Sequence, residues 1–174
     1  MSTLLLVDGN SIINRAYYAV IGRAPMTAPD GTPTGAVNGF FNSVLGVMKE
    51  YNPDYMCVLF DRKEPTFRHK MSTEYKANRK GMPDDLHAQM PVVKNLLDLY
   101  GIKRMELAGY EADDILGTVA RMAEIKGCEA YVLTGDRDSL QLITEKTSVL
   151  LATNTDTLLM NTEAFVEKYG VLPS

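Results

Sequence analysis

Seven acidic residues of this 174-residue chain stand at or close to the predicted ends of apolar segments. Asp8 closes the apolar run 4–7, Asp61 follows the run 56–60, and two further aspartates follow the run 131–134. In a parallel sheet the carboxyl ends of the strands meet at one edge, so we expect these side chains to lie close together there. The seven candidate metal ligands are Asp8, Asp61, Glu111, Asp113, Asp114, Asp136 and Asp138.

Carboxylates gathered in one place repel each other and cannot all stay ionised unless cations neutralise them. Ligand sets made only of oxygen atoms suit hard divalent ions such as Mg²⁺ or Mn²⁺. A pair of such ions can activate a water molecule and stabilise the leaving oxygen of a phosphodiester. The acidic pattern therefore predicts a metal-dependent enzyme that acts on phosphate esters.

Each of these acids also has an ordinary structural explanation when it is considered alone. Acids at 111, 113 and 114 favour any helix N-terminus because of the helix dipole. Asp8 stands before Gly9 and Asn10, which suit a turn, and Asp136 with Asp138 is a short motif of low specificity. The occurrence of all seven at successive strand ends favours the metal site over these separate explanations.

The segment 62–80 is basic although the whole chain has a formal net charge of −4. It holds seven lysine and arginine residues against two glutamates, the electrostatic pattern expected for a phosphate-bearing partner. Tyr75 stands beside Lys76 and near Arg79, so an aromatic ring could stack on a base while the cations bind phosphate. Arg15 follows Asp8 by about two helical turns and could reach a phosphate at the same edge. A solvated surface remains the alternative for all of these cations.

Composition indicates one soluble domain, spanning residues 1–174, with 45% hydrophobic and 23% charged residues. No apolar run approaches the roughly 20 residues that a membrane span needs, and no signal peptide is evident. Cys57 and Cys128 lack the spacing of metal ligands, so we expect inert thiols. We expect a cytoplasmic monomer that does not contact membranes.

Hydrophobic periodicity predicts alternating strands and helices, with one helix starting near Ile12. The segment 62–82 has no clear period and is predicted to be a loop or a loosely helical arch. Alternation of this kind indicates an α/β fold with a mostly parallel central sheet flanked by helices. Strands are predicted at 3–7, 55–60, 102–107 and 130–134, helices at 37–51, 86–100, 111–126, 138–144 and 162–169, and a hairpin at 149–151 with 158–160.

Several short motifs match one known family when they are taken together. They are LVDGNS at 6–11, RAY at 15–17, GAVNGF at 35–40, FD at 60–61, TFRH at 66–69, YKANR at 75–79, GYEADD at 109–114 and TGDRD at 134–138. With these motifs the chain resembles the flap-endonuclease family of 5′-nucleases, to which the N-terminal 5′-nuclease domains of bacterial DNA polymerases I belong. The resemblance covers essentially the whole chain.

This resemblance implies a PIN-like, resolvase-like 5′-nuclease core with a basic helical arch and two Mg²⁺ or Mn²⁺ ions. It implies cleavage of DNA at 5′ ends and 5′ flaps during primer removal and repair. The implied substrates are flapped DNA and RNA primer–DNA junctions, and the implied protein is fused to or works with a DNA polymerase. The resemblance implies that the first ion is bound by Asp8, Asp61 and Asp113, with Glu111. It implies that the second ion is bound by Asp113, Asp136 and Asp138, with Asp114 nearby. The DNA contacts that it implies are the catalytic pair Lys76 and Arg79, together with Tyr75 and Arg15.

One departure from the family pattern concerns the end of the chain. In the family a further pair of aspartates follows within a helix–three-turn–helix region that grips duplex DNA, and this sequence stops at Ser174, before them. We therefore expect that region to be absent, one metal ion to bind readily, the second to bind poorly, and cleavage to be weak.

Three alternative functions compete with this interpretation. A PIN-like ribonuclease would share the acidic site but usually lacks the basic arch segment. A nucleic-acid-binding fragment without activity would bind in a salt-sensitive way that is indifferent to Mg²⁺. A phosphotransferase or small-molecule phosphatase lacks support, because neither a P-loop nor a dinucleotide-binding motif is present.

Overall fold

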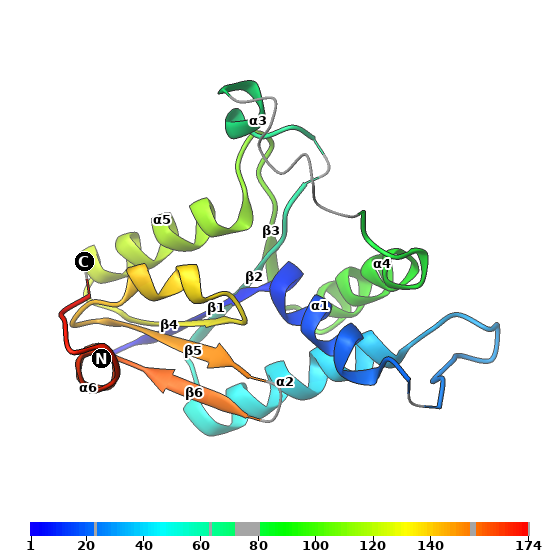
Figure 1. The fold of residues 1–174 in the computed structure, drawn as a ribbon, viewed down its shortest axis with the longest axis horizontal. Helices are drawn as coiled ribbons and strands as arrows, with labels where there is room; N and C mark the ends of the chain where they lie inside the picture. The colour runs from blue at the N-terminus through cyan, green and yellow to red at the C-terminus, as the bar shows by residue number, and fades with distance from the viewer. Residues whose placement is uncertain (23, 63, 72–80, 154–155, 174) are drawn as a thin grey trace.

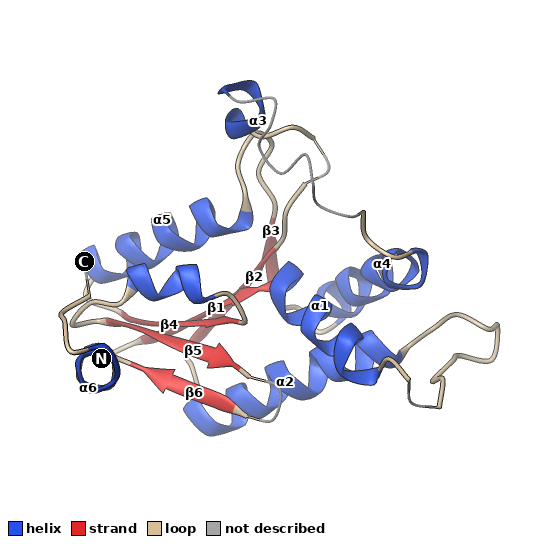
Figure 2. Ribbon diagram, viewed as in Figure 1, coloured by secondary structure: helices blue, strands red, loops and turns tan. Residues whose placement is uncertain are grey.

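The computed structural model describes residues 1–22, 24–62, 64–71, 81–153 and 156–173, and within these ranges it confirms the predicted α/β class (Figure 2). The strands form one sheet in the order β3-β2-β1-β4-β5-β6. All neighbouring pairs are parallel except β5 with β6, which form the predicted antiparallel hairpin. The strands are β1 (Thr3–Asp8), β2 (Tyr55–Leu59), β3 (Lys103–Met105), β4 (Glu129–Thr134), β5 (Thr147–Ala152) and β6 (Thr157–Met160).

Helices cover both faces of this sheet, as Figure 1 shows. α1, α2 and α4 pack on one face in a core that includes Phe40 and Leu97. α5 and the 3₁₀ helix η1 pack on the other face, around Leu116 and Leu140. The helices are α1 (Gly9–Val20), α2 (Gly35–Tyr51), α3 (Phe67–Met71), α4 (Asp84–Leu99), α5 (Ala112–Ile125), η1 (Arg137–Leu142) and α6 (Thr162–Tyr169).

The central strands are apolar because both of their faces are buried. On β1, Leu5 and Val7 belong to the core under α1, α2 and α4, whereas Leu6 belongs to the core under α5. A parallel sheet covered by helices on both sides requires such continuous apolar runs rather than alternation with polar residues. The register sets Val7 beside Val58 and Leu133, so β2, β1 and β4 end side by side.

Two local predictions about the edge of the sheet need correction or completion. The first helix starts at Gly9, not near Ile12, because Asp8 itself acts as its N-cap and accepts a hydrogen bond from the Ser11 amide. In the segment predicted as a loop or loosely helical arch, α3 is the helix within the described residues. Residues 72–80 lie outside the described ranges.

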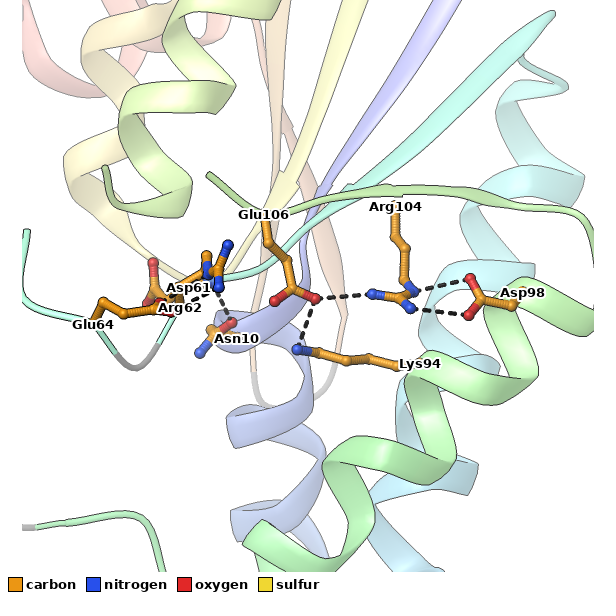
Figure 3. A network of polar contacts seen from close by, with 8 residues as sticks. All are labelled: Asn10, Asp61, Arg62, Glu64, Lys94, Asp98, Arg104 and Glu106. Carbon is orange, nitrogen blue, oxygen red and sulfur yellow. Dashed lines mark hydrogen bonds and ion pairs between the residues drawn. The ribbon is translucent and has the colours of Figure 1, made fainter. Parts of the chain in front are cut away.

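α4 is joined to its neighbours by polar side chains as well as by its apolar face. The ammonium group of Lys94 lies 2.8 Å from Glu106, the acid that directly follows β3 (Figure 3). The same group lies 5.0 Å from the ring centre of Phe60. Arg104 joins the same glutamate at 2.9 Å and also pairs with Asp98 of α4. These ion pairs hold α4 against the edge of the sheet formed by β3.

None of the helices in the described ranges is both long and apolar enough to cross a lipid bilayer.

Candidate active site at the carboxyl edge of the sheet

Asp8, at the end of β1, is the most deeply buried of the seven predicted acids, with 5% of its surface exposed. Its Oδ1 accepts a hydrogen bond from the Ser11 amide at 2.9 Å, and its Oδ2 accepts one from the Thr134 hydroxyl at 2.9 Å. The first contact begins α1 and the second joins β1 to β4. The carboxylate is therefore held in one orientation between two strand ends.

The surroundings of Asp8 disfavour its charged form. Burial raises the pKa of Asp8 from 3.8 to about 7, the negative charges of Asp113 and Asp61 add to this rise, and the two hydrogen bonds from Ser11 and Thr134 oppose it. Because charges act on each other in this way only at short range, Asp8 at the end of β1, Asp61 after β2 and Asp113 at the start of α5 share one region. This edge of the fold is suited to a cation.

Asp61 joins three elements at the end of β2. Its backbone amide donates to the Asn10 side chain of α1 at 3.0 Å, and its Oδ1 accepts from the Ala112 amide at 2.7 Å. The second contact satisfies an amide in the first turn of α5, which has no partner within the helix. Asp61 therefore fixes the start of α5, and with it Asp113, beside the strand ends.

Asp114 is paired with a cation that the sequence interpretation did not place in the site. Both of its oxygens accept hydrogen bonds from the Arg68 guanidinium at 2.7 Å, and Oδ2 also accepts from the Glu111 amide at 3.0 Å. Arg68 also lies 3.5 Å from the buried Glu111. The TFRH motif was a signal for Arg68, but its partner is 46 residues away and only the tertiary fold shows it.

Asp136 and Asp138 follow β4, as predicted, and take part in a local cap. The Asp136 carboxylate accepts from the Asp138 amide at 3.0 Å and so begins η1. The Asp136 amide donates at 3.1 Å to the same Thr134 hydroxyl that donates to Asp8. A chain of hydrogen bonds thus connects the β4 acids to the β1 acid, while the Asp138 side chain is exposed.

Arg15 lies at the same edge because α1 carries it over the turn after β4. A methyl group on Gly135 would lie 2.6 Å from Arg15 Cδ and 3.1 Å from the Ser11 hydroxyl, so a larger residue here would force the Arg15 side chain to move. Arg15 also lines a groove of about 1010 Å³ between α1, α2 and the β5–β6 connection. That groove is lined by none of the seven acids, so it is a neighbour of the acidic edge and not part of it.

The side chains as placed do not form a closed metal cage. Within the described part of the chain, no three carboxylate, histidine or cysteine side chains are grouped closely enough to hold an ion. The orientations are set by other partners, namely Arg68 for Asp114, the Ala112 amide for Asp61 and the Asp138 amide for Asp136. The predicted DNA contacts Tyr75, Lys76 and Arg79 lie outside the described residues.

A parallel sheet that gathers carboxylates at its carboxyl edge is the arrangement expected of an α/β domain that binds phosphate esters through metal ions. Residues 3–170 match the family model of the 5′-3′ exonuclease N-terminal resolvase-like domain. The chain belongs to this family.

Its relatives include longer proteins. It is 45% identical over 170 residues to the thermostable DNA polymerase I of Thermus filiformis and 43% identical over 173 residues to DNA polymerase I of Bacillus subtilis. In both cases 98% of this chain is covered, but the chain spans only 19% of the relative. Both relatives therefore contain long regions that have no counterpart here.

Solved structures share the fold at low sequence identity. Bacteriophage T5 flap endonuclease, in a pseudo-enzyme–product complex with DNA and metal ions, superposes with a TM-score of 0.68 at 18% identity, covering 97% of this chain and 61% of that one. The T5 5′-exonuclease with bound zinc gives a TM-score of 0.69 at 18% identity, with the same coverage. These likenesses bear on the fold alone.

Proposed function

We propose that this chain is a metal-dependent nuclease domain that hydrolyses DNA phosphodiesters at 5′ ends and 5′ flaps. The observation that carries the proposal is the position of Asp8, Asp61 and Asp113 at one sheet edge, where burial, together with the nearby charges of Asp113 and Asp61, raises the pKa of Asp8 to about 7. Membership of the 5′-3′ exonuclease family supports the same reaction. Carboxylates at this edge would repel the phosphates of DNA, so we expect a bound cation between the acids and the DNA.

The donor set fits Mg²⁺ or Mn²⁺ by its chemistry, because every donor is a carboxylate oxygen. When bound, a pair of such ions would lower the pKa of a water molecule and stabilise the leaving oxygen. Asp8 and Asp61 would hold the first ion with Asp113 and Glu111, and the β4 acids would hold the second with Asp113. Asp8 needs no reorganisation for this task, because Ser11 and Thr134 already hold its carboxylate.

Cations around the acids would bind the phosphate chain. Arg15 passes over Gly135 next to Asp136, a position from which its guanidinium could hold the phosphate beside the one that is cut. We assign the same type of contact to Lys76 and Arg79, whose charges would stabilise the transition state, and base stacking to Tyr75. Because the chain matches one region of DNA polymerase I relatives, we propose that the domain works with a polymerase and acts on flaps and primer junctions.

Replacing Asp61 by asparagine tests the proposal. Asparagine keeps an oxygen for the Ala112 amide, so the fold should remain, but it removes the charge that a metal ion needs. We expect cleavage of a fluorescent 5′-flap DNA in Mn²⁺ to fall by at least about 100-fold, the order lost with one transition-state contact. Exposed Glu167 on α6 provides the matched control, and Glu167→Gln should cut at the wild-type rate. Wild-type turnover by Asp61→Asn would end the proposal.

Two further assays separate the alternative functions. Faster cleavage of single-stranded RNA than of flapped DNA would identify the PIN-like ribonuclease. Tight, salt-sensitive binding of DNA that is unchanged by EDTA, without cleavage, would identify a binding domain. Cleavage of the flap that EDTA abolishes is the result we expect.

A further inference from the structure

Two exposed aromatic side chains lie beside the acidic edge. Phe67 begins α3, and Tyr110 directly precedes Glu111; their ring centres are 5.9 Å apart and their planes are inclined by 56°. They are 39% and 48% exposed, although rings of this size are usually covered. The Phe67 amide donates to the Gly109 carbonyl at 2.9 Å, so the two segments that carry the rings are joined through the backbone.

Arg68 holds this aromatic pair next to the acids. Its guanidinium carbon lies 4.6 Å from the ring centre of Phe67, while its nitrogens donate to both oxygens of Asp114. A planar guanidinium that donates two parallel hydrogen bonds to one carboxylate has little freedom to rotate. The order across the surface is therefore aromatic pair, restrained cation, acidic residues at the start of α5. Figure 1 shows α3 projecting from the body of the molecule beyond this end of α5.

We propose that Phe67 and Tyr110 form a stacking platform for an unpaired base of the DNA strand whose phosphate reaches the acids. This inference rests on the proposed nuclease function. An unpaired base offers an apolar face on a charged chain, and base–aromatic stacking is tolerant of sequence. The occupant is single-stranded DNA and not duplex, because bases inside a duplex are already stacked on their neighbours.

The platform explains features that a purely structural role does not need. Tyr110 is 48% exposed, and Phe67 stays 39% exposed although Arg68 lies over its ring. Both side chains can therefore be changed with little cost to folding, since exposed positions tolerate substitution. Their position next to Glu111 and Asp114 would fix the unpaired strand within reach of the reacting phosphate.

The test uses a 5′-flap DNA with 2-aminopurine at the unpaired positions next to the junction, and a second DNA with an abasic site there. The variants are Phe67→Leu and Tyr110→Leu, which keep apolar volume without a ring. Tyr55→Leu is the matched control, because Tyr55 is 61% exposed at the start of β2, the opposite edge of the sheet. Circular dichroism and thermal melting establish that each variant is folded.

We expect wild-type protein and the control to quench 2-aminopurine fluorescence, and both platform variants to lose the quenching. The KM for the flap should rise on the order of 10-fold in the variants, with kcat changed much less. The abasic DNA should raise the KM of the wild-type protein by the same factor. It should not raise the KM of the variants any further, because the same stacking contact is already missing in them.

Two results would overturn the platform while leaving the proposed nuclease function in place. If wild-type protein cuts the flap and the variants match it in quenching and KM, the rings do not contact a base. If the effects of the variants and of the abasic site multiply, the rings act through the structure and not by stacking. Failure of wild-type protein to bind or cut the flap at all would remove the proposed function, and the platform with it.

Discussion

At the scale of single residues, Asp8 shows how a site can oppose the stability of the protein that carries it. Its carboxylate is enclosed between β1, α1 and β4, and burial raises its pKa to about 7. Two hydrogen bonds hold it, yet they do not offset the loss of solvent and the nearby charges of Asp61 and Asp113. Such an arrangement is expected where a carboxylate is kept for a bound cation and not for folding.

Asp8→Asn should therefore stabilise the metal-free protein at neutral pH. The folded protein binds a proton that the unfolded chain has released between pH 3.8 and about 7, so wild-type stability falls as pH rises through this window. The loss is complete above about pH 7 and amounts to at most about 4 kcal/mol. In melting scans in EDTA, the melting temperature of the variant should equal that of the wild type near pH 3.8. The difference should grow up to pH 7 and reach on the order of 10 °C at pH 8.

The control for this experiment is Glu167→Gln, which removes a carboxylate exposed on α6. Its melting temperature should not rise above that of the wild type in a way that depends on pH. If Asp8→Asn melts at the wild-type temperature at pH 8, the Asp8 carboxyl is not destabilised by its surroundings.

At the scale of elements, α4 completes α2 as well as covering the sheet. The Thr34 side chain at the start of α2 makes no capping hydrogen bond. Instead the buried Gln89 of α4 reaches across, and its Oε1 accepts from the Ala36 amide at 2.8 Å and from the Val37 amide at 3.2 Å. Its amide nitrogen donates to the Asp85 carbonyl at 3.0 Å. The first turn of α2 is thus capped from another helix.

Gln89→Met should destabilise the domain by about 2–4 kcal/mol, because two buried amides lose their acceptor while the volume is kept. Urea unfolding should show a lower midpoint at an unchanged m-value. Gln141→Met, on the exposed side of η1, is the matched control and should stay within about 0.5 kcal/mol of wild type. Equal stability of the two variants would mean that α2 does not depend on this cap.

At the scale of the whole molecule, metal binding and folding should be coupled. β1, β2 and β4 are neighbours in the sheet, so an ion bound at their ends would join elements that are distant in the chain. An ion that binds only the folded state stabilises it, by about 2.7 kcal/mol at one hundred times its dissociation constant. Protons compete with the ion at Asp8 below about pH 7.

Mn²⁺ should therefore raise the melting temperature of the wild-type protein, and more at pH 8 than at pH 6. The expected rise at saturation is on the order of 5–10 °C at pH 8. Asp61→Asn should reduce the shift, Glu167→Gln should not, and sodium chloride at equal ionic strength should not reproduce it. An equal rise at both pH values would show that the ion binds away from Asp8.

The local features of this protein can be predicted from its amino-acid sequence. Apolar runs and their periods predicted the strands, the main helices and the α/β class, because these patterns act over a few residues. The same patterns set Asp8, Asp61 and Asp136 at strand ends, and the topology then made those ends neighbours.

The contacts between distant side chains could not be predicted in this way and are known from the folded structure. The pairing of Arg68 with Asp114, the capping of α2 by Gln89 and the contact of Phe67 with Tyr110 join residues that are more than 40 positions apart. Local pattern cannot specify such contacts, because they depend on how the sheet orders its strands and where each helix packs.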